Sequence, residues 1–567
     1  MFGFIKYHLS LVTVEQAFSG YINLTEVAGD EFGILSRVSS FLRTFFNCSG
    51  LTTVSEDLFK YCNAATNFSG TFLNCTSLSA ITNNLFVNCY NATNFNQVFQ
   101  GCKSLTNIPN SLFANCVNAT NFNNIFNGCS NLISIPEDLF KNNINANTFV
   151  SAFDSCSGLT SSIPEKLFET NINATNFTRT FYSCINLTGV IPENLFMNCK
   201  EVTTFDYTFW NCSGLTSIPE NLFVNCPNVT TFERTFYQCK NIISSIPENL
   251  FKNNINVINF NSTFLSCSGL IGSIPENLFV NCPNVTTFDS TFAGCSSLIG
   301  SIPENLFINC SKVTTFWQTF SNCSGLTGSI PENLFINCTG VTTFQSTFGK
   351  CSGLTGSIPE NLFASCTGVT TFQETFSGCS NLNGEIPGGL FRNNINVTRF
   401  DGTFNGCSRI SSISEELFKY NTNVVNFTST FSNCLGLTSI PGNLFMNNIN
   451  VTNFGFTFAS CPNIIEIPEN LFKYNIKATN FERVFYGLTK LQTIPNNVFD
   501  NNKNAVSFTR TFENCSGLTG NTPTGTDGLE LWERAGQPGY PSSIYGTQCF
   551  YRATRLTNYS SIPTGWK

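Results

Sequence analysis

The sequence predicts a repeat solenoid of about 19 coils, each 27 or 28 residues long. A phenylalanine in the phrase "TFxxC" recurs at that spacing, from Phe18 to Phe512. Within each copy, apolar residues return about every third position, and Asn, Ser, Thr and Gly fill most other places. One copy is too short to bury its own apolar side chains, so the copies must stack on one another.

Each copy has two halves, "LxxIPxxLFxxC/N" and "VxxFxxTFxxC". An apolar period of three is longer than the strand period of two and too regular for one long amphipathic helix. We therefore expect short extended pieces at "LTSI" and "VTTF", and one-turn helices or 3-10 turns at "ENLFVNC" and "STFAGC". Proline after isoleucine ends the extended piece and can open the turn, because it has no N–H to lose there.

The repeat predicts a solenoid over residues 1–520 and a different segment over residues 521–567. After Cys515 the rhythm breaks at "GNTPTGTDGLELWERAGQPGYPSSIYG", and a half-repeat returns around Phe550. A terminal repeat must present a polar face to water, so we expect residues 521–567 to form an irregular insert and a cap. At the other end, "FIKYHLSLVTVEQAF" reads as half a repeat, which predicts a start without an N-terminal cap.

The chain has 27 cysteines, of which seventeen occupy the "TFxxC" position and nine the "LFxxC" position. Asparagine replaces the second of these in eight copies, while the "TFxxC" cysteine stays in seven of those eight. A disulfide bridge between the two halves would leave the "TFxxC" cysteine without a partner in those copies. We therefore expect an inward-facing ladder of cysteine and asparagine, with reduced, buried thiols. Bridges between stacked coils remain the alternative.

Composition excludes several classes of function. The net charge is -7 without a basic cluster, which argues against nucleic acid as a partner. The sequence contains no stretch of 18 or more apolar residues, so it predicts no membrane-spanning segment. His8 is the only histidine and no CxxC pair occurs, so we expect no metal site and no histidine-based catalysis. Phosphate-binding loops are absent too, so we expect no cofactor and no enzyme. The glutamates of "IPEN" recur in most copies and are expected to serve the repeat.

The phrase "NVTTFDSTFAGCSSL" at residues 284–298 resembles the BspA-like leucine-rich-repeat surface proteins of bacteria, with Phe at the Met positions of that family. The resemblance covers about residues 14–520. It implies a leucine-rich-repeat-like solenoid on a cell surface, used for adhesion, without catalytic residues. The C-terminal tail is similar to tails on repeat proteins of gut bacteria and their phages.

Variable positions of a solenoid are the candidate ligand-binding positions. The residue after the "TF" phenylalanine is large and apolar in four successive copies, and two more aromatic residues occupy nearby variable positions. These six candidates are Tyr182, Trp210, Tyr237 and Leu265, with Tyr207 and Trp317. An exposed aromatic row suits a glycan or a protein partner. The alternative is that the rings cover a shallow edge of the core and contact only each other. Arg179 and Arg234 flank the row and are expected to add hydrogen bonds.

The sequence thus predicts a non-catalytic adhesion or recognition protein, either a bacterial surface adhesin or a phage host-attachment fibre. Its expected partner is a host-surface glycan or protein. The alternative is a structural protein that stacks end to end into filaments through its open N-terminal coil. We expect an extracellular, cell-surface or virion location. No signal peptide is visible, but either the natural start lies upstream or another chain covers this end, so this says little about the compartment.

Overall fold

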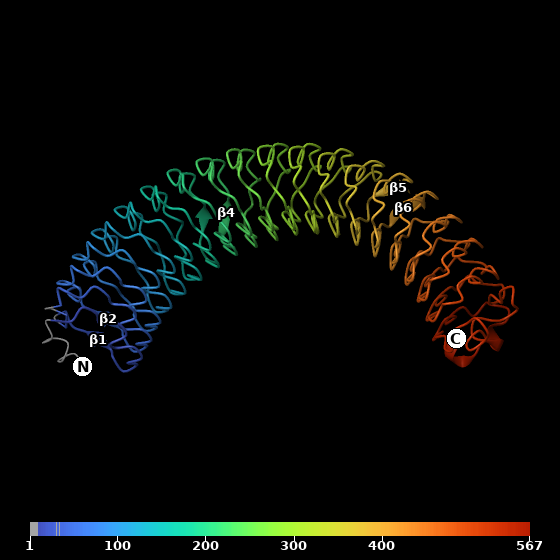
Figure 1. Cartoon of the computed structure of the whole chain (residues 1–567), viewed down its shortest axis with the longest axis horizontal. Coiled ribbons are helices and arrows are strands. Elements are labelled where there is room, and N and C mark those ends of the chain that lie inside the picture. Colours follow the sequence, from blue (N-terminus) through green and yellow to red (C-terminus); the bar gives the residue numbers. More distant parts are fainter. Residues whose placement is uncertain (1–9, 30, 33–34) are drawn as a thin grey trace. The chain divides into compact units, whose positions relative to one another are not determined.

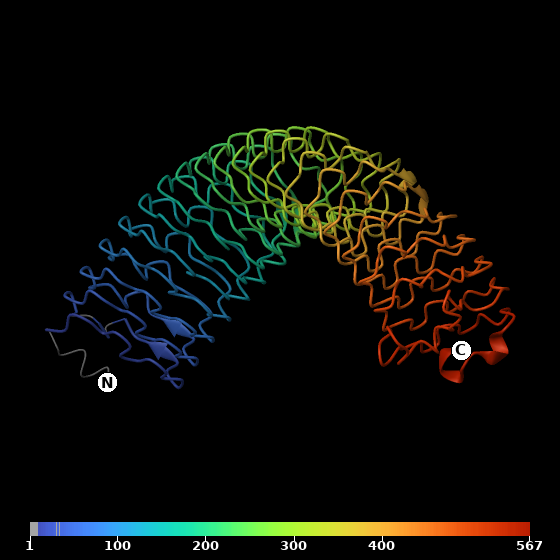
Figure 2. The same cartoon turned by 45° about the vertical axis from the view of Figure 1, so that its right-hand side comes forward.

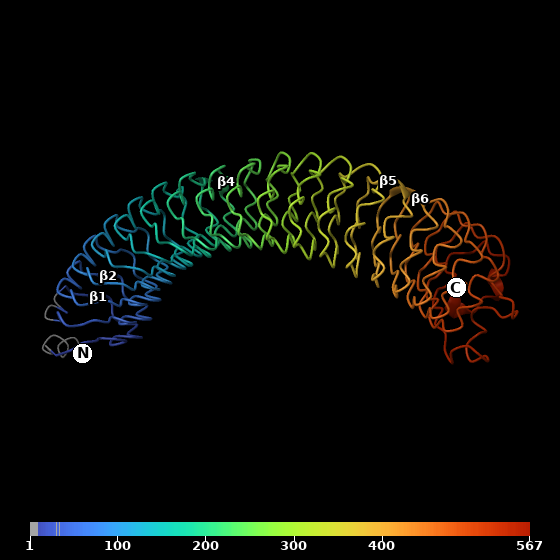
Figure 3. The same cartoon turned by 45° about the horizontal axis from the view of Figure 1, so that its top comes forward.

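The computed structural model describes residues 10–29, 31–32 and 35–567, in two compact units, residues 1–285 and 286–567. Within each unit the backbone winds into successive coils that lie side by side (Figures 1, 2 and 3). This confirms the predicted repeat solenoid. Residues 1–9, on which part of the expected N-terminal half-repeat falls, lie outside the described residues.

Regular secondary structure is sparse, and the strands that form pair in parallel, β1 with β2, β3 with β4 and β5 with β6. The first unit contains β1 (Glu26–Val27), β2 (Thr53–Val54), β3 (Gly189–Val190) and β4 (Leu215–Ser217). The second unit contains β5 (Asn383–Ile386), β6 (Arg409–Ile413) and the 3-10 helices η1 (Tyr559–Ser561) and η2 (Thr564–Trp566). The strand β4 coincides with an expected "LTSI" piece.

A ladder of single parallel bridges runs along the "VTTF" pieces, one bridge for each pair of neighbouring coils. In the first unit it runs from Thr13 to Asn259. In the second it runs from Thr287 to Tyr545. Each bridge joins equivalent residues one repeat apart, so the repeat length fixes the register of the stack. The expected "VTTF" pieces therefore form throughout each unit, whereas the "LTSI" pieces form strands only in some coils, as β1 to β6.

The expected helical pieces are hydrogen-bonded turns. In the "PENLFMNC" segment, the Leu195 N–H donates to the Pro192 carbonyl at 3.2 Å and the Met197 N–H donates to the Asn194 carbonyl at 3.1 Å. This i+3 to i spacing is the 3-10 pattern. Such bonds close only at every second residue, so these segments remain separate turns rather than continuous 3-10 helices.

The second half of each coil alternates the direction of its backbone hydrogen bonds. The Arg179 N–H donates to the Asp206 carbonyl of the next coil at 2.9 Å, whereas the Thr180 N–H donates back to the Phe177 carbonyl at 3.1 Å. This alternation requires left-handed backbone at two positions four residues apart, here Arg179 (φ 59°) and Ser183 (φ 55°). Buried backbone groups in this segment thereby find partners without a conventional strand or helix.

The buried threonine and cysteine of "TFxxC" connect neighbouring coils. The Cys184 thiol donates to the Phe153 carbonyl of the preceding coil at 3.0 Å, and the Thr180 hydroxyl makes an equivalent bond to Phe149 at 3.1 Å. Both side chains are small enough to be enclosed between phenylalanine rings. The phrase therefore recurs because it supplies two donors to each junction between coils.

Phenylalanine rings form the core of each unit. Phe181 stacks on Phe209, and Phe209 on Phe236, each pair with ring centroids 5.6 Å apart. Rings from the two halves of a coil also meet, as where Phe196 lies 4.7 Å from Phe205. All five side chains are fully buried. Each coil therefore covers the apolar face of its neighbour, which a single repeat cannot do alone.

The inward-facing ladder of cysteine and asparagine is confirmed. The Asn448 side-chain amide donates to the carbonyls of Phe418 and Asn421 in the preceding coil, at 3.1 and 2.9 Å, while its own Oδ1 has no partner. The eight buried asparagines of this kind are Asn143, Asn171, Asn254, Asn394, Asn421, Asn448, Asn475 and Asn502. All 27 cysteines are described and buried, none of them is joined in a disulfide, and the thiol donors in the "TFxxC" column support the reduced form.

The C-terminal tail lies against the coil that contains Phe550. The Gln548 and Phe550 N–H groups donate to the carbonyls of Gly565 and Trp566, at 2.9 and 2.8 Å. In other coils, the N–H groups at the equivalent positions donate to carbonyls of the next coil. The segment around η2 therefore takes the place of a next coil. The indole of Trp566 packs so closely on Gly546 that a Cβ there would lie 2.3 Å from the ring.

Candidate ligand-binding surface

Two columns of side chains in the first unit form the candidate site. The first column holds the left-handed residues before "TF": Arg179, Tyr207 and Arg234, with φ of 59°, 57° and 51°. The second column holds the residues after the "TF" phenylalanine, including Tyr182, Trp210 and Tyr237. Together these six residues are named the aromatic–guanidinium patch. Because the backbone fixes every coil in register, equivalent positions in neighbouring coils lie next to one another.

The three rings of the second column stack along the coils. The Trp210 ring lies parallel to Tyr182, with centroids 4.2 Å apart and planes 4° apart. On its other side Trp210 stacks on Tyr237 at 5.4 Å and 11°. Tyr207, from the first column, lies 6.5 Å from Tyr182 at a tilt of 43°. Both faces of Trp210 are therefore occupied by neighbouring rings.

Arg179 closes one end of the ring stack. Its guanidinium carbon lies 3.8 Å from the Tyr182 ring centroid, the distance of a close cation–π contact. Its Nε donates to Asp154 at 2.9 Å, and the Asp154 side chain is only 5% exposed. Asp154 also accepts a hydrogen bond from Ser155 at 2.7 Å. A buried carboxylate thus holds the guanidinium flat against the ring.

A second guanidinium is fixed two coils further on. Arg234 donates to the hydroxyl of Tyr207, and that hydroxyl donates to Glu233 at 3.0 Å. Burial, together with the negative charge of Glu233, raises the pKa of Tyr207. The phenol therefore keeps its proton and its role as donor to the carboxylate. This network positions Arg234 as Asp154 positions Arg179.

The patch is half-buried and contains polar groups without a hydrogen-bond partner among the described residues. The side chains of Tyr182, Trp210 and Tyr237 are all of intermediate exposure. Within the described part of the chain, the Tyr182 and Tyr237 hydroxyls and the Trp210 indole N–H make no hydrogen bond, and none of the three is buried. The patch therefore combines rigid, mutually supported rings with unused polar tips, which are properties of a binding surface.

The structure brings five of the six candidates into these columns. Leu265 follows Tyr237 in the second column and is half-buried, but no ring stacks on it. Trp317 lies in the second unit, directly after the first phenylalanine of its half-repeat, and belongs to neither column. Its side chain is 40% exposed, and its backbone N–H donates to Asp289 at 3.0 Å.

Both interpretations of the aromatic row find support in this geometry. The ring-to-ring contacts are those expected if the row only covers an edge of the core. The free polar tips are those expected of a binding site. Ligand binding by these residues therefore stays a prediction.

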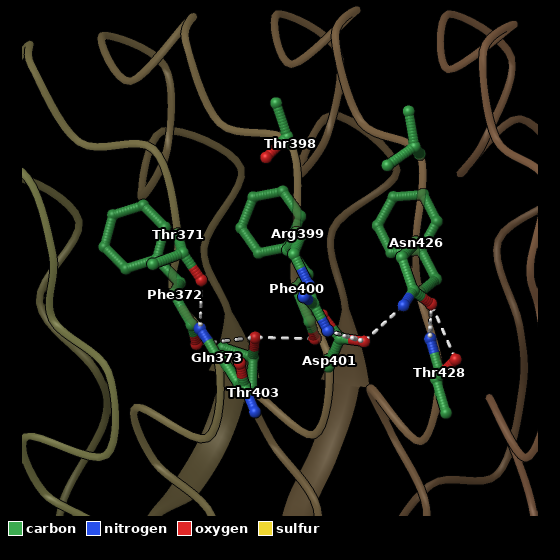
Figure 4. A network of polar contacts seen from close by, with 12 residues as sticks. Thr371, Phe372, Gln373, Thr398, Arg399, Phe400, Asp401, Thr403, Asn426 and Thr428 are labelled. Atoms are coloured by element: carbon green, nitrogen blue, oxygen red, sulfur yellow. Dashed lines mark hydrogen bonds and ion pairs between the residues drawn. The ribbon is translucent and has the colours of Figure 1, made fainter.

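A polar network lies on the bridge ladder of the second unit (Figure 4). There Arg399 donates through Nε to Asp401 at 2.8 Å, and Asp401 also accepts from Asn426. Asn426 in turn accepts from the hydroxyl of Thr428 at 2.6 Å. Each of these groups is held by its neighbours. The network consequently offers less unused hydrogen-bonding capacity than the aromatic–guanidinium patch.

Sequence reasoning missed the carboxylates that position the two arginines. Asp154 stands at the Tyr182 position of the preceding coil, so column alignment alone could have suggested the pair. Glu233 directly precedes Arg234, and nothing in that dipeptide shows that Tyr207 joins them. Arg399 and Asp401 were also missed, although their i, i+2 spacing in an extended piece puts both on one face.

The repeated "IPEN" glutamates make contacts between coils, as expected of residues that serve the repeat. Glu193, for example, accepts a hydrogen bond from Asn221 in the next coil at 2.6 Å. Across the described residues, no three His, Cys, Asp or Glu side chains are grouped so as to hold a metal ion. In the same part of the chain, no helix has the length and apolar character needed to cross a membrane.

The fold and the surface define a repeat protein with a preformed patch of aromatic and guanidinium groups. The model of the family described as "Mycoplasma protein of unknown function, DUF285" matches residues 35–140, 147–277, 230–361, 273–388 and 370–524. These matches span most of the chain, which belongs to this family. Comparison with curated proteins gives no match.

Several solved structures are similar to this chain. The plant peptide hormone receptor RGFR1 in complex with RGF2 is 17% identical, with 85% of this chain and 81% of that chain covered and a TM-score of 0.40. A leucine-rich repeat protein from Bacteroides ovatus is 17% identical, with coverages of 71% and 88% and a TM-score of 0.39. A TDR receptor is 16% identical, with coverages of 94% and 85% and a TM-score of 0.42.

Proposed function

We propose that this chain is a non-catalytic recognition protein that attaches to a partner through its aromatic–guanidinium patch. The observation that supports this most is the column of Tyr182, Trp210 and Tyr237, whose rings are fixed by stacking while their polar tips stay free. Tyrosine, tryptophan and arginine are the residues that most often dominate binding energy at interfaces. Rings already held in place lose little entropy on binding.

The biological setting that fits this role is a bacterial surface adhesin or a phage host-attachment fibre, located outside the cell or on a virion. The resemblance of "NVTTFDSTFAGCSSL" to BspA-like repeats favours the cell surface. Twenty-seven buried cysteines without disulfide bonds suit assembly in a reducing cytoplasm, which favours the virion. The genes next to its coding region separate the two, since tail genes there would indicate a virion.

Replacing Trp210 with alanine tests the role. Fluorescently labelled full-length chain is incubated with a panel of bacterial and host cells, and attachment is measured by flow cytometry. We expect Trp210→Ala to weaken attachment about tenfold or more, as for an interface hot spot. Tyr90→Ala, which removes an exposed aromatic ring outside both columns, serves as the control. Unchanged attachment by a folded Trp210→Ala variant would assign the row to packing alone.

A further inference from the structure

The unused hydrogen-bonding capacity of the aromatic–guanidinium patch consists mainly of donors. Arg179 engages Asp154 through Nε, and its two terminal amino groups have no partner within the described residues. The indole N–H of Trp210 is a donor only, and the phenol groups of Tyr182 and Tyr237 add two O–H groups. The nearby carboxylates are occupied instead, because Asp154 accepts from Arg179 and Ser155 while Glu233 accepts from Tyr207. A complementary ligand must therefore bring acceptors.

Neutral acceptors fit the two guanidiniums less well than charged ones. Hydrogen bonds between a guanidinium and a carboxylate are roughly twice as strong as neutral bonds, and two can form side by side. Arg179 is 41% exposed and Arg234 39% exposed, so both are accessible. The Asp154 carboxylate is nearly fully enclosed, so it orients Arg179 while presenting little negative charge to an approaching ligand.

The ring stack disfavours a sugar as that ligand. Aromatic side chains hold a pyranose by offering a flat face to it. Trp210 has both faces covered, by Tyr182 and Tyr237, and Arg179 covers the outer face of Tyr182. For Tyr182 and Trp210, what remains accessible is therefore a row of ring edges with polar tips. Ring edges and donor tips suit the irregular surface of a polypeptide, as in interfaces rich in tyrosine and arginine.

Resting on the proposed recognition role, we propose that the patch binds a polypeptide segment that carries carboxylate side chains. Arg179 and Arg234 occupy the same position of the repeat, two coils apart, with Tyr207 between them. Each arginine accommodates one carboxylate of the segment. The tips of Tyr182, Trp210 and Tyr237 donate to acceptors between these two points. The bound segment therefore lies along the direction in which the coils stack.

Binding of the full-length chain to an array of random dodecapeptides with graded Asp and Glu content tests this proposal. The expected result is strong enrichment of Asp and Glu among bound peptides, with signals that fall as salt is added. For a soluble copy of a bound peptide, Arg179→Gln and Arg234→Gln are each expected to lower the affinity about tenfold. Lys252→Gln removes one exposed positive charge outside the patch and is expected to change the affinity less than twofold.

One further variant and one further ligand distinguish the possible outcomes. Arg179→Lys keeps the charge but loses the planar fork, so an intermediate loss is expected, and it replaces Arg179→Gln if that variant fails to fold. Oligogalacturonate supplies carboxylates on sugars, and binding of it in place of acidic peptides would overturn the polypeptide assignment. Bound peptides without acidic enrichment, or equal affinities for the arginine variants, would overturn the carboxylate assignment. Loss of cell attachment in Trp210→Ala alongside either result would leave the recognition role standing.

Discussion

The hydroxyl group of Thr180 donates to the carbonyl oxygen of Phe149 in the preceding coil, at 3.1 Å. The same hydroxyl also lies 2.7 Å from the carbonyl of Phe177 in its own coil. The equivalent threonine of the next coil, Thr208, makes the same two contacts. A single buried atom thus joins two coils, and it recurs along the stack.

Replacing Thr180 with valine should destabilise the chain by about 1 kcal/mol, because valine keeps the shape but removes the donor. Both carbonyls also accept backbone N–H groups, from Ala152 and from Thr180 itself, so neither is left unpaired. Urea unfolding of the full chain measures the change. Thr175→Val is the control, since that exposed hydroxyl donates to Asn147 at 3.0 Å and water can replace it. Equal losses for the two variants would contradict the role of burial.

Replacing Asn448 with cysteine should be nearly neutral for stability. The substitution removes the two hydrogen bonds that the side-chain amide donates. It also removes the buried Oδ1, whose lack of a partner costs the native protein about 1–3 kcal/mol. Nine other copies already carry cysteine at this position. Asn448→Asp should instead be strongly destabilising near neutral pH, because it buries a carboxylate among acceptors. Thermal unfolding of the two variants checks the contrast, and a cysteine variant as unstable as the aspartate variant would refute it.

The buried thiols predict loss of stability at high pH. Burial raises the pKa of Cys407 to about 12, and Cys199 behaves alike. Well below about pH 8.5, the pKa of an exposed thiol, folded and unfolded chains keep the same protons and these groups have no effect. Between that value and about 12, the unfolded chain binds fewer protons than the folded one, so the free energy of unfolding falls as pH rises.

Unfolding midpoints measured from pH 7 to pH 11 test this prediction, and alkylation supplies an independent readout. Iodoacetamide reacts with thiolates, so at pH 8.5 the folded chain should remain unmodified while the chain in guanidinium reacts at its cysteines. Rapid alkylation of the folded chain would show that the thiol columns are open to water.

Replacing Gly546 with alanine should release the C-terminal tail, because the added carbon would lie 2.3 Å from the Trp566 ring. The expected result is faster hydrogen exchange at the amides of Gln548 and Phe550, which donate to the tail. Gly520→Ala is the control, since its added carbon meets only Thr493 at an ordinary 3.7 Å. Unchanged exchange in Gly546→Ala would show that the tail is held elsewhere.

The regular part of the fold could be predicted because the repeat length fixes it. Equivalent apolar residues must stack in register, and this requirement alone places Phe181 on Phe209. The alternation of cysteine and asparagine likewise predicts a buried ladder without bridges between the halves. These features depend on the length of the repeat and on the size of the residues, both of which can be read from the sequence.

The site was less predictable, because it depends on backbone and rotamer details. Nothing in the residue types marks Arg179 and Tyr207 as left-handed, since that conformation is uncommon outside glycine and asparagine. Yet this conformation belongs to the coil and is adopted there by almost any residue. Column alignment predicts that Tyr182 and Trp210 are neighbours, but not that they stack face to face and leave only their edges accessible.

The hydrogen bonds that join coils repeat with the period of the sequence, and each is made between immediate neighbours. A gain or loss of one whole phrase would then change the length of the protein by one coil and recreate the same joints on either side. The joints between coils therefore do not restrict the number of coils, whereas a change at a single position such as Trp210 alters the exposed surface.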